Sequence, residues 1–248
     1  NTPYGIIRQN GKLLIGPQFS TIEPFVNGYA RVEVAHGSWK FIDTSGRVFP
    51  DEGFRNLHDF SDGLAAVKSR NGWGFIDTNG NEAFPEKYSD VGDFHEGFSK
   101  AKIQLKSKYG GLVKPRQVYV IIDKQGKIVF NTKSRSCSDV SRGLVILENK
   151  RKCSLKSLDG RKMIPGTFLQ IISFSKYGLY LVKNKAKQYA LFDYKGKQLI
   201  PFGKYKDYDN FSEGLCYVKG SESGFIDTLG ILKLKFVCEK TKGFAEGL

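Results

Sequence analysis

One stretch of the chain carries residues spaced as in a catalytic loop. Residues 73–80 read WGFIDTNG, in which the apolar pair Phe75 and Ile76 leads to Asp77, two small polar residues and Gly80. Nucleotide hydrolases hold magnesium beside a phosphate with an aspartate at the end of a buried strand, so this spacing could serve phosphoryl transfer. A P-loop hydrolase also needs the motif G-x-x-x-x-G-K-S/T, which no stretch of the sequence matches. We therefore expect Asp77 and Gly80 to have a structural role.

Two histidines stand beside acidic residues and could form acid–base pairs. They are His58, next to Asp59, and His95, next to Glu96. The two pairs lie at different distances from the glycines that recur along the chain, and no nucleophile motif stands at a defined spacing from either. Chance surface histidines are therefore favoured over an active site.

The cysteines argue against a metal site. No two of them have C-x-x-C spacing, and all three histidines lie in the other half of the chain, so zinc ligation is not expected. Four cysteines in 248 residues are not a dense framework, which favours isolated buried thiols over a structural disulfide. We expect no cofactor and no metal. The four are Cys137, Cys153, Cys216 and Cys238.

The composition is typical of a soluble globular protein. Hydrophobic residues make up 40% of the chain and aromatic residues 13%, enough for a core built without metals or disulfides. No apolar run approaches the roughly 20 residues that a membrane span requires. The only methionine is Met163 and the first residue is Asn1, so we expect a fragment or a processed form, and the sequence assigns no compartment.

Two series of glycines recur in register along the chain. The first has successive spacings of 35, 34, 46, 34, 36 and 34 residues, and a glycine of the second follows each member by 17 or 18 residues. This double period indicates seven copies of one unit in a single repeat domain, residues 1–248. The first series is Gly11, Gly46, Gly80, Gly126, Gly160, Gly196 and Gly230, and the second is Gly28, Gly63, Gly97, Gly143, Gly178, Gly214 and Gly247. The units span about residues 4–37, 38–72, 73–118, 119–152, 153–187, 188–222 and 223–248.

Each unit reads as short strands joined by tight turns. Residues 74–77 are apolar, residues 78–80 form a turn, and a second strand is expected to end at Pro85. Runs that alternate apolar and polar residues supply further strands, and no window shows a sustained 3.6-residue period. We therefore expect an all-β chain with few helices.

The aspartate before each turn has a role that requires no phosphate. Its carboxylate can accept hydrogen bonds from amides two or three residues on, and the glycine three residues later adopts a positive φ, which together predict a type I turn with a glycine bulge. The aspartates that fit are Asp43, Asp77, Asp123, Asp193 and Asp227.

The third unit shows the repeat in its fullest form. Its residues 73–77, WGFID, are followed at fixed spacing by Gly80, Pro85, Tyr88, Val91, Phe94, Glu96 and Gly97. This pattern resembles the repeat of the bacterial WG-repeat proteins, and the resemblance covers essentially the whole chain. The copies that match well begin near Tyr4, Ser38, Trp73, Tyr189 and Ser223. Those near Tyr119 and Cys153 are degenerate, and we expect irregular blades there. The resemblance implies short β repeats that serve as binding surfaces, with no catalytic residue to carry over.

The repeat number predicts the architecture. Seven units of about 35 residues fit a seven-bladed β-propeller, which closes on itself and leaves only short edges. The alternative is an open β-solenoid or superhelical array of hairpins, in which each unit contacts only its neighbours. The seventh unit stops at Leu248, where its final strand should start, which weakens the case for a ring. We favour the propeller.

Recurrent phenylalanines precede the second glycine of most units. Their fixed position favours core packing between blades over a binding stripe, because each unit must bury its faces against its neighbours. They are Phe25, Phe60, Phe94, Phe174 and Phe211.

Charge is distributed unevenly along the chain. Residues 1–99 hold 9 Lys and Arg against 13 Asp and Glu, whereas residues 100–248 hold 30 against 12. The positive field of residues 100–248 attracts polyanions and acidic proteins, and salt weakens the attraction. Lysine outnumbers arginine 29 to 10, which suits diffuse attraction better than sequence-specific reading of nucleic acid.

The irregular spacing of 46 residues places an insertion of about eleven residues within residues 106–117. Insertions in repeat proteins map to loops that often bind partners. The candidate partner-binding residues are Lys106, Lys108, Tyr109, Lys114 and Arg116. A solvated hairpin tip is the alternative. A second basic stretch within residues 150–162 is expected to protect an outer blade edge against aggregation.

Three functions follow from these features. The first is a non-catalytic scaffold that binds a protein partner, possibly an acidic one, through its basic face and the insertion. The second is a module that binds polyanions such as nucleic acid, an anionic membrane or a glycan by charge alone. The third, an enzyme with a site at the propeller axis, is disfavoured because the sequence shows no acid, base or metal constellation.

Overall fold

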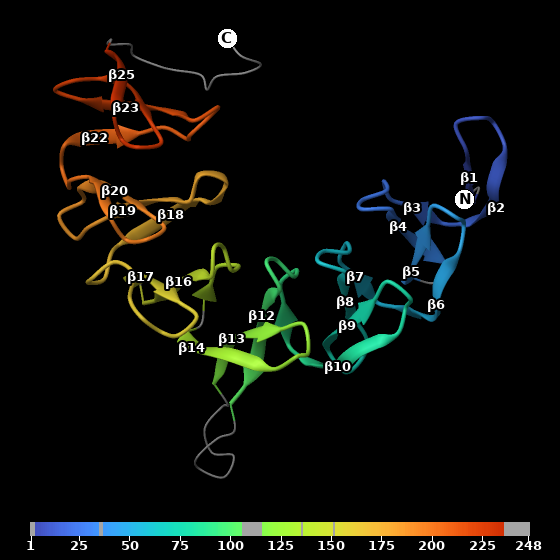
Figure 1. The fold of residues 1–248 in the computed structure, drawn as a ribbon. Helices are drawn as coiled ribbons and strands as arrows, with labels where there is room; N and C mark the ends of the chain where they lie inside the picture. Colours follow the sequence, from blue (N-terminus) through green and yellow to red (C-terminus); the bar gives the residue numbers. More distant parts are fainter. Residues whose placement is uncertain (1–2, 35–36, 106–115, 135, 151, 236–248) are drawn as a thin grey trace. The chain divides into compact units, whose positions relative to one another are not determined.

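The protein is built almost entirely from β-strands in small antiparallel sheets (Figure 1). The chain divides into two compact units, residues 1–135 and residues 136–248. No helix in the described parts of the chain is long and apolar enough to cross a membrane. The predicted all-β class is confirmed. The structure is a computed structural model that describes residues 3–34, 37–105, 116–134, 136–150 and 152–235.

In the described part of the first unit, a two-stranded sheet precedes three four-stranded ones. Each four-stranded sheet is a meander, because its strands pair in the order in which they follow along the chain. The strands are β1 (Tyr4–Ile7) and β2 (Leu13–Phe19); β3 (Thr21–Ile22), β4 (Tyr29–Val34), β5 (Ser38–Asp43) and β6 (Val48–Phe54); β7 (Asn56–Leu57), β8 (Leu64–Lys68), β9 (Trp73–Asp77) and β10 (Glu82–Tyr88); and β11 (Asp90–Val91), β12 (Phe98–Gln104), β13 (Gln117–Asp123) and β14 (Ile128–Ser134).

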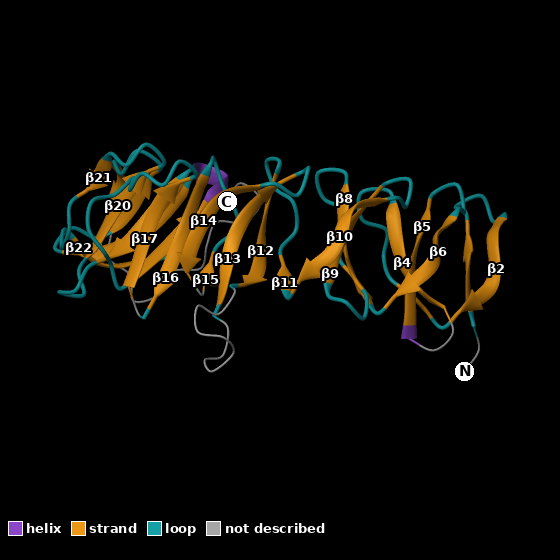
Figure 2. Cartoon of the chain, turned by 90° about the horizontal axis from the view of Figure 1, so that it is seen from below, coloured by secondary structure: helices purple, strands orange, loops and turns teal. Residues whose placement is uncertain are grey.

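The second unit repeats this construction, and its described residues form a three-stranded sheet and two four-stranded ones. Figure 2 shows the strands of its sheets side by side, joined by short loops. The strands are β15 (Ser136–Cys137), β16 (Leu144–Asn149) and β17 (Lys152–Ser157); β18 (Gln170–Phe174), β19 (Leu179–Lys183), β20 (Tyr189–Asp193) and β21 (Gln198–Ile200); and β22 (Tyr205–Tyr208), β23 (Leu215–Gly220), β24 (Gly224–Asp227) and β25 (Leu232–Lys235), with a 3₁₀ turn, η2 (Ser175–Tyr177), before β19.

The boundaries of the sheets do not coincide with the boundaries of the sequence repeats. The strand that opens with Trp-Gly, β9, is an inner strand that pairs with β8 on one side and β10 on the other. The sequence unit 73–118 therefore supplies the last two strands of one sheet and the first two of the next. Each four-stranded sheet combines halves of two successive repeats.

One of the two degenerate copies is irregular. The sheet that contains Cys153 has three strands, and Cys153 makes an isolated bridge to Phe168. The copy near Tyr119 forms a regular four-stranded sheet, contrary to expectation. The reason is that β13 keeps fully buried residues at alternate positions, such as Val120 and Ile122, and these are what packing against a neighbouring sheet requires.

A sheet that lies between two others buries both of its faces. In β8, Ala66 belongs to the same hydrophobic cluster as Phe94 of the following sheet, whereas Ala65 clusters with Phe41 of the preceding sheet. Successive residues of a strand point to opposite faces, so one short apolar strand serves two cores.

Of the five predicted phenylalanine positions, two are buried and two are partly buried. Phe60 and Phe94 are 3% and 0% exposed, and the partly buried Phe174 and Phe211 contact each other with ring centroids 5.1 Å apart. Phe25 is 40% exposed, so its assignment to the core was wrong.

Phe25 is exposed because the sheet before it is narrow. Its counterpart Phe60 contacts Tyr29 of β4 in the preceding sheet, with ring centroids 4.4 Å apart. The β1–β2 sheet has no strand equivalent to β4 within the described residues, so Phe25 lacks that contact.

The aspartate turns form as predicted, with one change in the bonding. The Asp77 carboxylate accepts hydrogen bonds from the amides of Asn79 and Asn81, both at 2.9 Å. The amide of Gly80, which has φ +90°, donates to the Asp77 backbone carbonyl oxygen instead of to the carboxylate. The carboxylate therefore accepts from the amides two and four residues later, whereas the prediction named the amides two and three residues later. Burial opposes ionisation of Asp77, but these hydrogen bonds outweigh it and lower the pKa of the carboxyl. The same bonds recur at Asp43, Asp123, Asp193 and Asp227.

Pro85 lies inside β10 instead of ending a strand, which corrects the sequence prediction. β10 is an edge strand, and its pairing with β9 shifts register between Phe84 and Tyr88. A bulge on an edge strand tolerates a residue that has no amide hydrogen to donate.

Closure of the sheets into a seven-bladed ring would join the two compact units, and it stays a prediction.

Candidate functional site

The insertion lies in sequence between β12 and β13, which pair as a hairpin. Its base is closed by a hydrogen bond of 2.8 Å from the Leu105 amide to the Arg116 carbonyl oxygen. Arg116 is exposed, and its Nη2 donates to the Lys133 carbonyl oxygen at 3.1 Å. The other predicted contacts lie outside the described residues, and they are Lys106, Lys108, Tyr109 and Lys114.

Lys133 was not singled out from the sequence, yet it lies beside Arg116. The register of β13 and β14 places Ser134 opposite Tyr119, after a shift that follows Asn131. At this bulge the Lys133 amide donates to the Asn131 side chain at 3.1 Å, and Lys133 is exposed with φ 52°. Arg116 and Lys133 are 17 residues apart and meet only because the register of β13 and β14 shifts, so no sequence pattern could predict that they lie side by side.

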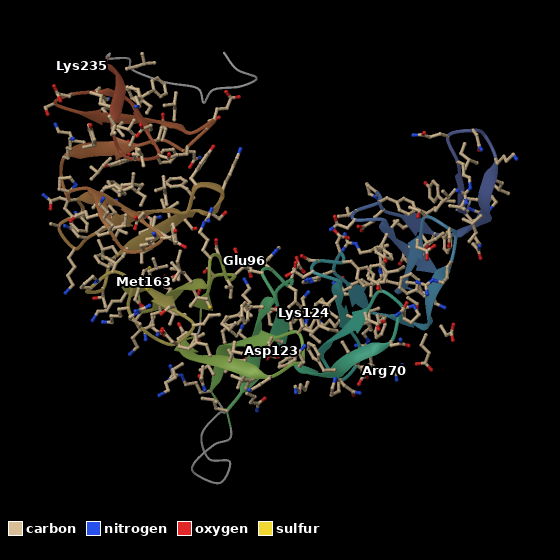
Figure 3. All side chains as sticks on the ribbon, in the orientation of Figure 1. Arg70, Glu96, Asp123, Lys124, Met163 and Lys235 are labelled. Atoms are coloured by element: carbon tan, nitrogen blue, oxygen red, sulfur yellow. The ribbon has the colours of Figure 1, made fainter. Side chains whose placement is uncertain are left out.

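The sheet that carries the insertion concentrates positive charge. Residues 100–135 contain ten Lys and Arg, and their only acidic residue is Asp123. Lys102 approaches Asp90 of the same sheet at 3.9 Å and lies 4.8 Å from the Tyr119 ring centroid, so part of its charge is compensated. Figure 3 labels Lys124 beside Asp123, in the turn at the other end of β13 from the insertion.

His58 links two neighbouring sheets and is not simply a chance surface histidine. Its Nδ1 lies 2.7 Å from the Asp93 carboxylate, and its ring meets Trp73 edge-on, with ring centroids 4.7 Å apart. The Ser61 hydroxyl donates to the Phe94 carbonyl oxygen between the same two sheets at 2.6 Å, and Asn27 Nδ2 donates to the Phe60 carbonyl oxygen at 2.9 Å between the preceding pair of sheets. The His58–Asp93 pair therefore takes part in the packing of sheet on sheet.

Removing the Asp93 carboxylate is expected to destabilise the first unit. The hydrogen bond from His58 is the main cause that lowers the pKa of Asp93, against the effect of burial. Because the pair is partly exposed, Asp93→Asn should reduce the free energy of unfolding by on the order of 1 kcal/mol near neutral pH. A carboxyl whose pKa falls on folding stabilises the native state when the pH is above the pKa of the unfolded state, which is near 3.8 for Asp93. This stabilisation is lost as the pH falls through the pKa of the folded state.

Urea titrations of wild type and Asp93→Asn at several pH values measure this effect. Tryptophan fluorescence reports on the first unit, because both tryptophans, Trp39 and Trp73, lie in it. The stability difference should be full at about pH 6 and shrink below about pH 4. A difference that persists undiminished at the lowest pH would contradict the assigned role of Asp93.

Comparison with known sequences identifies the repeat. The profile of the WG containing repeat matches residues 4–35, 73–109 and 189–219. The chain contains WG repeats in these three segments. Among curated proteins, no sequence matches it.

Solved structures resemble the WG-repeat chain at low identity. The computationally designed Ika8 protein has 12% identity and a TM-score of 0.43, over 88% of this chain and 73% of that chain. BamB from Moraxella catarrhalis has 9% identity and a TM-score of 0.39, over 84% of this chain and 70% of the BamB chain. The WD40 β-propeller domain of Doa1 has 10% identity and a TM-score of 0.37, over 90% of this chain and 83% of the Doa1 chain.

The WG-repeat chain keeps its described thiols inside. Cys137, Cys153 and Cys216 are buried, as predicted, and Cys238 lies outside the described residues. Burial raises the pKa of Cys216 to about 12, so this thiol stays protonated and unreactive at neutral pH. Within the described ranges, no group of three or more His, Cys, Asp or Glu could hold a metal ion.

Proposed function

We propose that this WG-repeat protein is a non-catalytic β scaffold that binds an acidic protein partner through the sheet β11–β14. The observation that carries the proposal is the charge of residues 100–135, ten basic residues against one acidic. A segment with such a charge raises the rate of encounter with an acidic surface and favours it over other partners.

The end of the sheet that carries the insertion is the proposed centre of contact. Arg116 and Lys133 are both exposed there and lie side by side, and the predicted contact residues of the insertion directly precede Arg116 in sequence. A cluster of unlike basic side chains, arginine with lysine, can meet several carboxylates of a partner at once.

Binding of a labelled poly-glutamate peptide to wild type and charge variants tests the proposal. The double variant Arg116→Gln/Lys133→Gln should bind about 10-fold more weakly, and further substitution of Lys106, Lys108 and Lys114 by Gln should weaken binding again. The matched control is Lys124→Gln/Lys127→Gln, which removes the same charge from exposed residues at the opposite end of β13 and should leave affinity nearly unchanged.

Three comparison ligands decide between this function and attraction to polyanions in general. Heparin, duplex DNA and anionic vesicles are titrated at rising salt, since binding by charge alone weakens steeply as salt increases. Binding of any of them at physiological salt as tightly as the peptide would favour the polyanion alternative. Equal loss of affinity in the control and the double variant would mean that the contact site is misplaced.

A further inference from the structure

A second concentration of positive charge lies in a cleft of the second compact unit. The cleft has a volume of about 530 Å³ and is bordered by the turn before β16 and by the turns that follow β17 and β20. Met163, labelled in Figure 3, lines it after the turn of β17. The other side chains that matter here are Arg142, Arg161, Lys162, Tyr194 and Lys195.

Arg142 reverses the charge that other repeats place at its position. It is the first of two residues with positive φ in a tight turn, at φ 53° before Gly143 at φ 69°. A turn of this kind favours Asn or Asp at the first position. Most other repeats have Asn or an acidic residue at this position, and the fifth has a tyrosine; the residues are Asn27, Asp62, Glu96, Tyr177, Glu213 and Glu246.

The side chain of Arg142 is held over the cleft from two sides. Its guanidinium carbon lies 5.5 Å from the ring centroid of Tyr194. A Cβ added to Gly178 would lie 2.8 Å from Arg142 Nε, whereas the equivalent Gly63 and Gly97 face open space. The missing side chain at Gly178 therefore leaves the room that Arg142 uses.

Three further residues of the cleft depart from the repeat. Tyr194 and Lys195 stand where the second and third repeats have Thr-Ser and Thr-Asn, in the turns of Asp43 and Asp77. Lys162 stands two residues after the turn glycine, where most other repeats carry an apolar or uncharged residue. Together with Arg142, these three residues line one cleft.

The carboxylates of the turns beside the cleft are engaged mainly within those turns, and the charge of Arg161 is attracted to one of them, Asp159. Asp159 accepts hydrogen bonds from the Ser157 hydroxyl and, at 3.0 Å, from the Arg161 amide, and Asp193 accepts the Lys195 amide at 2.9 Å. Both carboxylates thus serve turn backbones. Among the described residues, no carboxylate lies within 4.0 Å of the charged nitrogens of Arg142, Arg161, Lys162 or Lys195.

We propose that this cleft binds a phosphate monoester carried by a peptide, that is, phosphoserine or phosphothreonine. A phosphate monoester bears a charge of about −1.5 to −2 and three acceptor oxygens, which suits two arginines and two lysines better than one carboxylate does. A cleft of about 530 Å³ has room for one phosphorylated side chain, whereas a polynucleotide needs an extended basic groove. The site is independent of the proposed function, because that function concerns residues of the first unit.

Fluorescence anisotropy with a labelled phosphoserine peptide, otherwise uncharged, tests this site at physiological salt. The unphosphorylated peptide and a peptide with glutamate at the same position are the comparison ligands. Arg142→Asn places at the turn the residue that occupies position 27, so the fold should be retained while affinity falls about 10-fold or more. Lys195→Asn, which copies position 79, should act in the same direction. Lys206→Gln, an exposed residue of β22 outside the cleft, is the control and should bind as wild type does.

The outcomes separate the site from its rivals. Preference for the phosphorylated peptide, lost in both cleft variants and kept in the control, supports the proposal. Absence of binding, equal binding of the unphosphorylated or glutamate peptide, or unchanged affinity in Arg142→Asn and Lys195→Asn overturns it. Single-stranded DNA that binds more tightly than the phosphopeptide, and only when Arg142 is present, would reassign the cleft to nucleic acid. Circular dichroism of each variant shows whether it is folded, and the two variants alter different turns, so one remains informative if the other unfolds.

Discussion

Phe94→Ala is expected to lower the free energy of unfolding of the first unit by about 3–5 kcal/mol. Phe94 is 0% exposed and packs against Phe75 and Phe84 of the preceding sheet, with ring centroids 4.9 Å and 6.3 Å away. Truncation to alanine leaves a cavity between two sheets whose backbones are fixed by their own hydrogen bonds, so little collapse can relieve it. Urea unfolding followed by tryptophan fluorescence measures the loss.

Phe25→Ala is the matched control for Phe94→Ala. Phe25 occupies the same position in its repeat but is 40% exposed, so its truncation should cost less than about 1 kcal/mol. Equal costs at the two positions would show that Phe25 is packed in solution, and the explanation from the narrow β1–β2 sheet would then fail.

Gly196→Ala is expected to cost roughly 3–4 kcal/mol in the second unit. Gly196 closes the turn that begins at Asp193 and has φ +83°, a conformation that a side chain disfavours. A Cβ at Gly196 would also lie 2.2 Å from the carbonyl oxygen of Met163 in the neighbouring sheet segment. The obstacle is backbone, so relief requires the sheets to move apart.

Gly214→Ala separates the two causes. Gly214 lies in the same unit at φ +82°, but a Cβ there would meet nothing within 4 Å. Its substitution should cost only the conformational part, about 1–2 kcal/mol. Thermal and urea unfolding, followed by circular dichroism, measure the stability of the two variants. Equal losses of unfolding free energy in Gly196→Ala and Gly214→Ala would contradict the close backbone contact at Gly196.

The Gly196 contact also connects stability with the proposed phosphate site. Met163 lines the cleft, and its carbonyl oxygen is the atom that excludes a side chain at Gly196. Gly196→Ala should therefore weaken phosphopeptide binding as well as folding, whereas Gly214→Ala should affect folding alone.

The sequence by itself determined the parts of this protein that depend on a few neighbouring residues. The turn at Asp77 and Gly80 closes through hydrogen bonds that span at most four residues, so its residue types predict it wherever it recurs. The double glycine period and the alternating apolar runs determined the all-β class and the repeat in the same way. The phase of the sheets was hidden, because a periodic sequence reads equally well from any starting point and only strand pairing shows that β9 is third in its sheet.

Only the tertiary structure decided which side chains meet. His58 and Asp93, Arg116 and Lys133, and Arg142 and Tyr194 are 35, 17 and 52 residues apart, and each pair is brought together by stacking of sheets or by a shifted register. Such meetings depend on the distance between backbones and on the space that a small residue such as Gly178 leaves. Turn chemistry is local and can be read along the chain, whereas a binding surface depends on contacts between residues far apart in sequence, which the sequence does not encode locally.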